Sequence, residues 1–567
     1  MQDSLTARLN RSAPLREVAQ IGAAIGREFS YELLAAVAAR PEDELHNALA
    51  QLMSAGLVLA RGQPPEAVYT FKHALVQDAA YATLIRVRRA QIHGQIASSM
   101  AERHPDLVRR QPEVLARHLT EAGLTSEAIE YWLKAGQLAA ARSATVEAVS
   151  HLTNGLGLLA RLEGGIERDR MELEFQTVLG PALNAAKGYA APETMAAFQR
   201  AQELIRQTGD RSRQNAMLTG LFVAYFNRAE FQKAYEVAAE FLNTAERQDD
   251  PAPRCIGHRM VAASLNTMGD FRPALPHAEA ALAFYDPERH GPLAWHYIHD
   301  LGVAALNHLG ISLWHAGCVD RSIMCEREAL ALADRLRHPN STGYALWYCG
   351  VVSAFRRRDF GELQCQAEHL RAYGRDHDLP HWVQFAMCLE GTALAAAGHA
   401  EDGITLIQEG IRACEVTHSK AFRPAFLAGL AEAQLWANRW NEAEQTIETA
   451  LRMSEQTFER WMDAELWRLK GQASVFSGRQ APGETEALFR RAAECAERQG
   501  SRPLHLRAVT SLARLWHDQG RGDEARNLLV PIHAWFSDGF DTPDLRDARA
   551  LLAELRCRKL PCRPPHE

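Results

Sequence analysis

The residue types that could carry chemistry in this chain of 567 residues are 23 histidines, ten cysteines and many carboxylates. Their spacing matches no common catalytic or metal-binding arrangement, because the sequence contains no Cys-x-x-Cys pair and no Gly-x-Ser-x-Gly nucleophile elbow. His296 and His299 have a spacing that puts two imidazoles on one helix face, but zinc needs further converging ligands and we identify none. We therefore predict a chain without catalytic residues, metal or cofactor, which is not an enzyme by itself.

Arg289, His290 and Asp300 are the residues that we predict to line a groove for a ligand or partner. The segment YDPERHGP, from Tyr285 to Pro292, interrupts an otherwise regular helical pattern. Insertions in repeat arrays tend to lie near binding faces, where loop side chains carry recognition. A guanidinium, an imidazole and a carboxylate in this region could bind a polar effector or a partner protein.

The elements that must position these residues are helices. From residue 112 onward, Ala-rich amphipathic segments of roughly seventeen residues are paired across short turns. The turns are separated by 48, 41, 40, 40, 40 and 42 residues and lie at Gly269, Gly317, Arg358, Gly398, Asn438, Gly478 and Gly520. Because no single pair can bury its apolar face, we expect residues 106–555 to stack into an α-solenoid of about ten helix pairs, with a period near 40.

Residues 1–105 have a different pattern. Three helical stretches precede two short apolar runs that flank a Gly/Pro turn, in the order Leu15–Ala24, Tyr31–Ala39, Glu42–Ala55, Leu57–Leu59 and Val68–Phe71. The two apolar runs predict a β-hairpin. Three helices followed by a hairpin are typical of a winged-helix module. The fold class that we predict is all-α, a solenoid behind this small module, with residues 556–567 as a flexible tail.

The charge distribution argues against nucleic acid as a partner. The formal net charge is -7 and the isoelectric point is near 6.4. The helix in the recognition position of the winged helix begins with Glu42, Asp43 and Glu44, whose carboxylates repel phosphate. No apolar run approaches the roughly eighteen residues of a membrane span, and the N-terminus lacks a signal-peptide pattern. We expect a cytoplasmic protein that binds neither nucleic acid nor membrane.

Several motifs carry a resemblance to known families. The repeats resemble tetratricopeptide repeats, since a turn glycine is followed by a helix with small residues, as in Gly269 with Ala274 and Ala281. The segments VAQIGAAIGREFSYELLAAV and FKHALVQDAAY and the closing GRGDEARNLLVPIHAWFSDGFDTPDLRDARALLAEL resemble the C-terminal half of bacterial signal-transduction ATPases with numerous domains. Those proteins are often fused to adenylate/guanylate cyclase domains, and the resemblance spans nearly the whole chain.

The resemblance implies a conditional role for His73. In the ATPases of that class, a histidine of the winged helix can contact the phosphates of a bound nucleotide, and His73 in FKHALVQ has the matching position. The alternative is a histidine that caps or packs against the start of the next helix. The sequence contains no Gly-Lys-Ser/Thr of a phosphate-binding loop, so we expect a fragment or a separately encoded half that does not bind ATP alone.

Together these observations predict the non-catalytic sensor or protein-interaction region of a bacterial signalling ATPase or cyclase-linked regulator. The concave face of the repeats would bind a protein or a small effector, and the winged helix would relay binding to an ATPase or cyclase domain in cis or in trans. Two alternatives are a part of a transcription regulator of the ATPase-plus-repeat class and a free-standing tetratricopeptide adaptor.

Overall fold

The computed structural model of the chain describes residues 12–142, 144–188, 190–210, 213–291, 299–478 and 481–557. Its contacts divide the chain into two compact units. Unit 1 comprises Met1–Ala186 with Ala196–Arg211, and unit 2 comprises Lys187–Met195 with Ser212–Glu567. Each unit has its own apolar core, so each is described separately below.

Unit 1 begins with a small mixed module. Its elements follow in the order α2 (Ala13–Ile25), β1 (Glu28–Ser30), α3 (Tyr31–Ala38), α4 (Glu42–Ser54), β2 (Val58–Arg61) and β3 (Val68–Phe71). The three strands form an antiparallel sheet in the order β1-β3-β2. The predicted hairpin is therefore confirmed as β2 and β3. The sequence analysis did not identify β1, because three residues are too few to show an alternating pattern.

Helices continue from this module through the rest of unit 1. They are α5 (Ala74–Ala82), α6 (Arg86–Arg103), α7 (Pro105–Arg110), α8 (Pro112–Ala122), α9 (Thr125–Ala141), α10 (Thr145–Leu159) and α11 (Ile166–Lys187), and α12 (Pro192–Thr208) follows. A single apolar core extends from Leu15 in α2 to Ala197 in α12, so the module and the first helix pairs share their buried side chains.

Unit 2 is a continuous array of antiparallel helix pairs. Its helices are α13 (Gln214–Asn227), α14 (Phe231–Ala245), α15 (Pro251–Met268), α16 (Phe271–Ala283), α17 (Pro287–His290), α18 (Leu301–His315), α19 (Val319–Leu336), α20 (Pro339–Ala345), the π-helical segment η2 (Leu346–Val352), α21 (Ser353–Arg357), α22 (Phe360–Asp376), α23 (Pro380–Ala396), α24 (Ala400–Val416), α25 (Arg423–Trp436), α26 (Trp440–Thr457), α27 (Asp463–Ser477), α28 (Pro482–Gln499), α29 (Arg502–Asp518), α30 (Gly522–His533) and α31 (Pro543–Cys557).

The turns of the array occupy the predicted positions. All seven predicted turn residues have a left-handed backbone, with φ between 57° and 100°. Ala229, 40 residues before Gly269, has the same conformation with φ 57° and marks one more turn that its residue type concealed. The predicted fold class, an all-α tetratricopeptide-like solenoid behind a small module with a hairpin, is confirmed.

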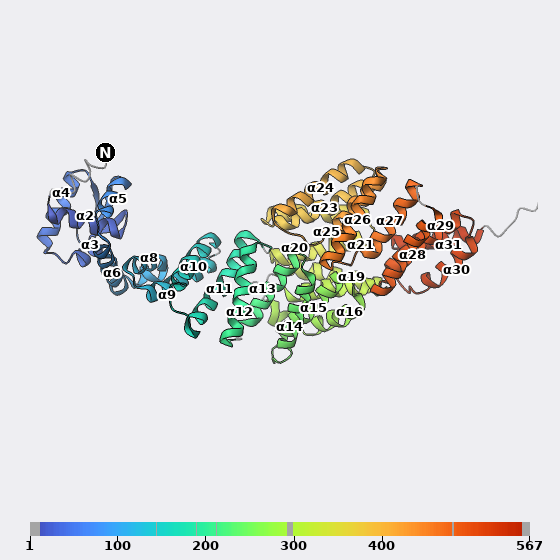
Figure 1. Cartoon of the computed structure of the whole chain (residues 1–567), viewed down its shortest axis with the longest axis horizontal. Helices are drawn as coiled ribbons and strands as arrows, with labels where there is room; N and C mark the ends of the chain where they lie inside the picture. Colours follow the sequence, from blue (N-terminus) through green and yellow to red (C-terminus); the bar gives the residue numbers. More distant parts are fainter. Residues whose placement is uncertain are drawn as a thin grey trace, which may run out of the picture. The chain divides into compact units, whose positions relative to one another are not determined.

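The solenoid of unit 2 curls until distant repeats contact each other. The Lys420 N–H donates a hydrogen bond of 2.9 Å to the Asn227 carbonyl, and the Arg460 N–H donates one of 3.0 Å to the Thr267 carbonyl. Figure 1 shows the corresponding helices, α23–α26, alongside α13–α16. The inner side of unit 2 is therefore a largely closed interior, and much of it is filled by side chains.

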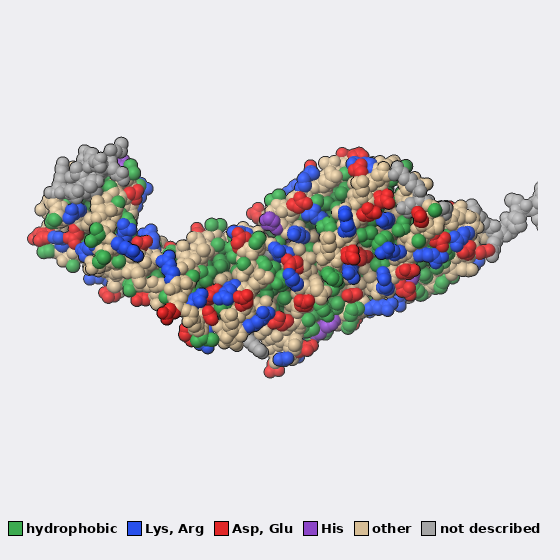
Figure 2. All heavy atoms as spheres, in the orientation of Figure 1, with side chains coloured by type: hydrophobic (Ala, Val, Ile, Leu, Met, Phe, Trp, Pro, Cys, Tyr) green, Lys and Arg blue, Asp and Glu red, His purple; other side chains and the backbone are tan. Residues whose placement is uncertain are grey.

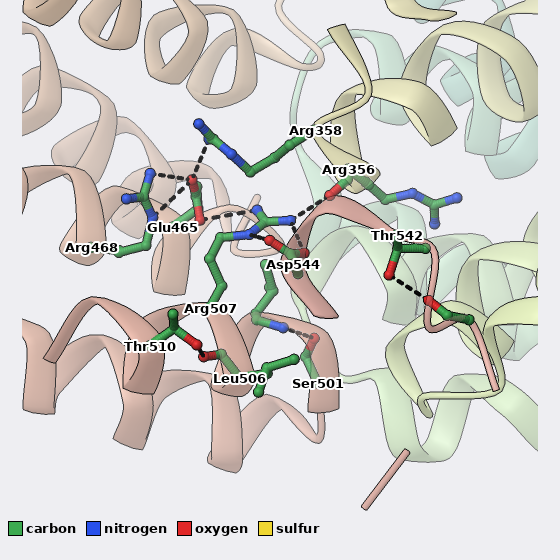
Figure 3. Close-up of polar contacts among 12 residues, drawn as sticks. Arg356, Arg358, Glu465, Arg468, Ser501, Leu506, Arg507, Thr510, Thr542 and Asp544 are labelled. Carbon is green, nitrogen blue, oxygen red and sulfur yellow. Dashed lines mark hydrogen bonds and ion pairs between the residues drawn. The ribbon is translucent and has the colours of Figure 1, made fainter. Parts of the chain in front are cut away.

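A buried ionic network holds one part of this interior together (Figure 3). Arg507 of α29 pairs with Asp544 of α31 at 2.7 Å and with Glu465 of α27 at 3.1 Å. Arg507 also donates a hydrogen bond of 2.6 Å to the carbonyl of Arg356, which lies in α21. Glu465 accepts further bonds from Arg468 and Arg358. One guanidinium thus links α27, α29 and α31 to α21, whose Arg356 precedes Arg507 by 151 residues.

The exterior has no dominant charge of either sign on the face that Figure 2 presents, where Lys and Arg side chains are interspersed with Asp and Glu. Within the described residues, no cluster of three or more His, Cys, Asp and Glu side chains could hold a metal ion. No helix in the same parts of the chain is both long enough and apolar enough to cross a membrane.

Candidate functional site

A cavity of about 90 Å³ remains inside unit 2, where the first and middle repeats of the curled array meet. Seven of the side chains that line it are aromatic rings other than histidine: Phe222, Phe226, Tyr344, Tyr348, Trp382, Phe385 and Phe422. The other lining residues are Val223, Asn227, Arg259, Ala263, His299, Asn340 and His381. No carboxylate is among these lining residues.

Helical periodicity explains why these side chains converge. Phe222 and Phe226 are four residues apart in α13, and Arg259 and Ala263 are four apart in α15, so each pair shares one helix face. Because α13 and α15 flank α14 in the array, their inner faces point to the same interior. A further lining residue, Tyr344, comes from α20.

Phe422 closes the cavity from the start of α25. Its backbone is left-handed, with φ 64°, and its N–H donates a hydrogen bond of 3.1 Å to Oε2 of the buried Glu459. Its ring packs edge-on against Trp347, with ring centroids 5.2 Å apart, and against Phe385 at 5.5 Å. Phe422 therefore combines a turn-like backbone conformation with a side chain that is fixed in the cavity wall.

Arg259 is the one side chain that is charged at neutral pH among the described residues of the cavity lining. It is 5% exposed, its Nε is buried without a partner, and its guanidinium has a hydrogen bond with the Tyr344 side chain but no ion pair with any described carboxylate. Its guanidinium carbon lies 5.4 Å from the centroid of the Phe222 ring, within the range of a cation–π contact. Burial lowers the pKa of Arg259, and attraction to the Tyr344 side chain partly offsets this effect.

The two histidines of the cavity are uncharged at neutral pH. Burial lowers the pKa of His381 to about 4 and holds the pKa of His299 well below its ordinary value. The His299 ring stacks on Tyr344 with centroids 4.1 Å apart, and the Tyr344 hydroxyl lies 2.9 Å from Nε2 of His308. The arrangement can bind a flat apolar group between aromatic walls and can offer that group one positive charge.

The structure places the predicted groove residues apart from this cavity. Arg289 is exposed, whereas His290 and Asp300 are buried. His290 accepts a hydrogen bond of 3.1 Å from the Asp286 N–H. Asp300 caps α18 by accepting a hydrogen bond of 2.9 Å from the Val303 N–H, and it also accepts the Tyr285 hydroxyl at 3.2 Å. The contacts of His290 and Asp300 therefore hold the local fold together.

His73 precedes α5 at its N-cap position, and its side chain is exposed and does not cap the helix. Its predicted contact with nucleotide remains a prediction. His296 lies outside the described residues. Its neighbour in the predicted pair, His299, lines the aromatic cavity.

Arg259 is a lining residue that we did not predict from the sequence. The signal that could have identified it is the composition of α15, PAPRCIGHRMVAASLNTM, in which Arg254 and Arg259 are the two charged residues. An arginine in the middle of a helix that is apolar on nearly all sides must be buried, and a buried arginine needs a reason.

Comparison with known proteins gives one relative in sequence and several in structure. No family model matches the chain. It is 26% identical over 521 residues to an uncharacterized protein of Rhizobium meliloti (strain 1021), R02095, covering 90% of this chain and 50% of the relative. The chain thus spans about half the length of this curated relative.

Three solved structures are similar to the chain at low identity. The apo form of RapI is 13% identical with a TM-score of 0.41, covering 51% of this chain and 98% of RapI. A signal-transduction ATPase with a tetratricopeptide repeat sensor, PH0952 from Pyrococcus horikoshii, is 12% identical with a TM-score of 0.25. The match covers 97% of this chain and 66% of PH0952. The Cut9-Hcn1 complex is 12% identical with a TM-score of 0.38, covering 83% and 93%.

Proposed function

We propose that this chain is the sensor region of a signalling protein, and that its effector is a small molecule bound in the aromatic cavity of unit 2. The observation that carries the proposal is the cavity itself. A close-packed interior rarely leaves a space of this kind, and a concave apolar site with a few converging polar groups is the usual form of a ligand site.

The position of the cavity connects binding to the shape of the solenoid. Its walls come from α13, α15, α20, η2, α23 and the start of α25, which are successive repeats of the array. The Lys420–Asn227 hydrogen bond lies beside the lining residues Asn227 and Phe422. A ligand that contacts all these repeats stabilises the curled form over any more open form, by as much as its affinity for the two forms differs.

We further propose that α2, α3, α4 and the sheet β1-β3-β2 form a winged helix that relays this change. Helix, strand, helix, helix and hairpin follow one another in the order expected for such a module. In the ATPases that the sequence resembles, this module adjoins a nucleotide-hydrolysing domain. An ATPase or cyclase domain, in cis or in trans, is therefore the proposed output.

Ligand-observed NMR tests the cavity as a binding site. We expect benzamide, a small neutral aromatic probe, to bind the wild-type chain at millimolar concentration and to lose binding in Ala263→Leu, which adds carbon atoms inside the cavity. Ala283→Leu is the matched control, because Ala283 is exposed at the end of α16. Equal benzamide signals in wild type and Ala263→Leu would contradict the proposal.

The proposed output has its own test. The protein, tagged at its chromosomal locus and purified under native conditions, should carry ATP-hydrolysing or cyclase activity, either in the same polypeptide or in a tightly bound subunit. Preparations without any nucleotide-dependent activity would show that this part of the proposal is wrong and would leave the cavity measurements unaffected.

A further inference from the structure

We propose that the effector is a small organic carboxylate, an anion attached to a flat apolar ring, and that Arg259 is the residue that binds its carboxylate. This inference rests on the proposed function of the cavity and specifies its ligand.

Buried arginines other than Arg259 have carboxylate partners throughout the described residues. The pairs are Arg356 with Glu326 at 3.2 Å, Arg423 with Glu415 at 3.3 Å, Arg468 with Glu465 at 2.8 Å and Arg507 with Asp544 at 2.7 Å. Each of these arginines is at most 9% exposed. Arg259 is 5% exposed and has no such partner in the same parts of the chain.

This difference has a physical meaning. A buried guanidinium without an anion loses its hydration and gains no ion pair in return, which destabilises the fold. The Phe222 ring and the Tyr344 side chain compensate in part. A bound carboxylate would supply the missing charge, and the planar guanidinium with its Nε–H would hold it through two parallel hydrogen bonds.

The rest of the cavity selects the body of the ligand. Among the described residues, the lining contains no carboxylate that would repel an anion, and its aromatic walls match a flat ring better than a branched or strongly hydrated group. Inorganic phosphate carries more charge than the single Arg259 can neutralise, and it has no apolar face to pack against the aromatic walls. A volume of about 90 Å³ suits a small molecule with a single ring.

Three probes of nearly equal shape separate charge from fit. Benzoate is an anion, benzamide is neutral and benzamidine is a cation. We expect benzoate to bind the full chain at least about tenfold more tightly than benzamide, because an ion pair with buried arginine is stronger than a neutral hydrogen bond. Benzamidine and inorganic phosphate should show no binding in the cavity, as judged by competition with benzoate.

Substitution of the arginine completes the test. Arg259→Gln should reduce benzoate affinity at least about tenfold and leave benzamide affinity within about twofold, whereas Arg259→Lys should restore part of the benzoate affinity. Arg289→Gln removes the same charge from an exposed position and should change neither affinity. Hydrogen exchange of α13 and α25 verifies that each variant remains folded.

Two results would overturn the inference. If benzamide binds wild type as tightly as benzoate, or if Arg259→Gln retains full benzoate affinity, then the cavity binds ligands but Arg259 does not select an anion. If none of the three aromatic probes binds wild type, the proposed function of the cavity itself is wrong, and the inference is wrong with it.

Discussion

Replacement of Arg507 by methionine tests how the solenoid of unit 2 is held in its curled form. Arg507 donates hydrogen bonds to both carboxylate oxygens of Asp544, at 2.9 Å and 2.7 Å, to Glu465 at 3.1 Å and to the Arg356 carbonyl at 2.6 Å (Figure 3). Methionine has a similar length but makes none of these bonds. Asp544 would lose its ion-pair partner, while Glu465 would keep Arg468 and Arg358.

The expected loss of stability follows from the burial of the pair. The side chains of Arg507 and Asp544 are 9% and 12% exposed. Water can therefore replace few of the hydrogen bonds that Asp544 loses when Arg507 is removed. Removing one partner of a buried pair typically costs about 3–5 kcal/mol, and the remaining partners of Glu465 favour the lower end, about 3 kcal/mol. A double substitution, Arg507→Met with Asp544→Leu, leaves no unpaired charge at Asp544 and should recover most of this loss.

Urea denaturation of wild type, Arg507→Met, Asp544→Leu and the double variant measures these free energies of unfolding. Hydrogen exchange around Leu529 in α30 reports whether the C-terminal repeats open locally. Burial by itself raises the pKa of Glu465, but the guanidinium groups of Arg468, Arg507 and Arg358 together hold it below its usual range. Stability from this network should therefore be complete above the ordinary glutamate pKa of 4.5 and decline as the pH falls below it. A loss below about 1 kcal/mol in Arg507→Met at pH 7 would show that this ionic network does not hold the solenoid in its curled form.

Three further predictions concern other parts of unit 2. Burial raises the pKa of Glu459 to about 8, so the folded state binds this proton more tightly than the unfolded state does. The free energy of unfolding should therefore fall as the pH rises from about 6 to about 9. Urea midpoints should show this fall, and the fall should be smaller in Glu459→Gln. Gly391→Ala should destabilise by about 2 kcal/mol or more, because a Cβ there would meet the Gly403 carbonyl at 2.6 Å, whereas Gly483→Ala on an open helix face should stabilise slightly in the same assay. Asp300→Ala removes the cap of α18 and should lower the thermal midpoint by the equivalent of about 1–2 kcal/mol, and a neutral result would show that Asp300 is not structural.

The sequence predicted the repeating part of the fold because that part is local. A turn every 40 residues with a small residue after it depends on the helix pair alone, and the left-handed φ at Gly398 and Asn438 confirms the positions. The closure of unit 2 depends instead on partners far apart in the chain. His315 Nδ1 and Ser501 Oγ, 2.8 Å apart in space, are separated by 186 positions, and no periodic pattern marks such a pair.

The candidate site could be predicted only in part for the same reason. The insertion after α16 is close in sequence to His299, which lines the cavity. The adjacent carboxylate, Asp300, serves instead as the cap of α18. Arg259 is identifiable as unusual from its apolar helix. That it lacks an anionic partner among the described residues emerges only when α13, α20 and α25 are packed around it.

The most direct measurement of the central claim is a crystal structure of the protein grown with benzoate. We predict electron density for one benzoate in the aromatic cavity, with the ring between Phe222 and Tyr344 and both carboxylate oxygens within about 3.2 Å of the Arg259 guanidinium. A cavity that stays empty at saturating benzoate, or a benzoate whose carboxylate points away from Arg259, would contradict it.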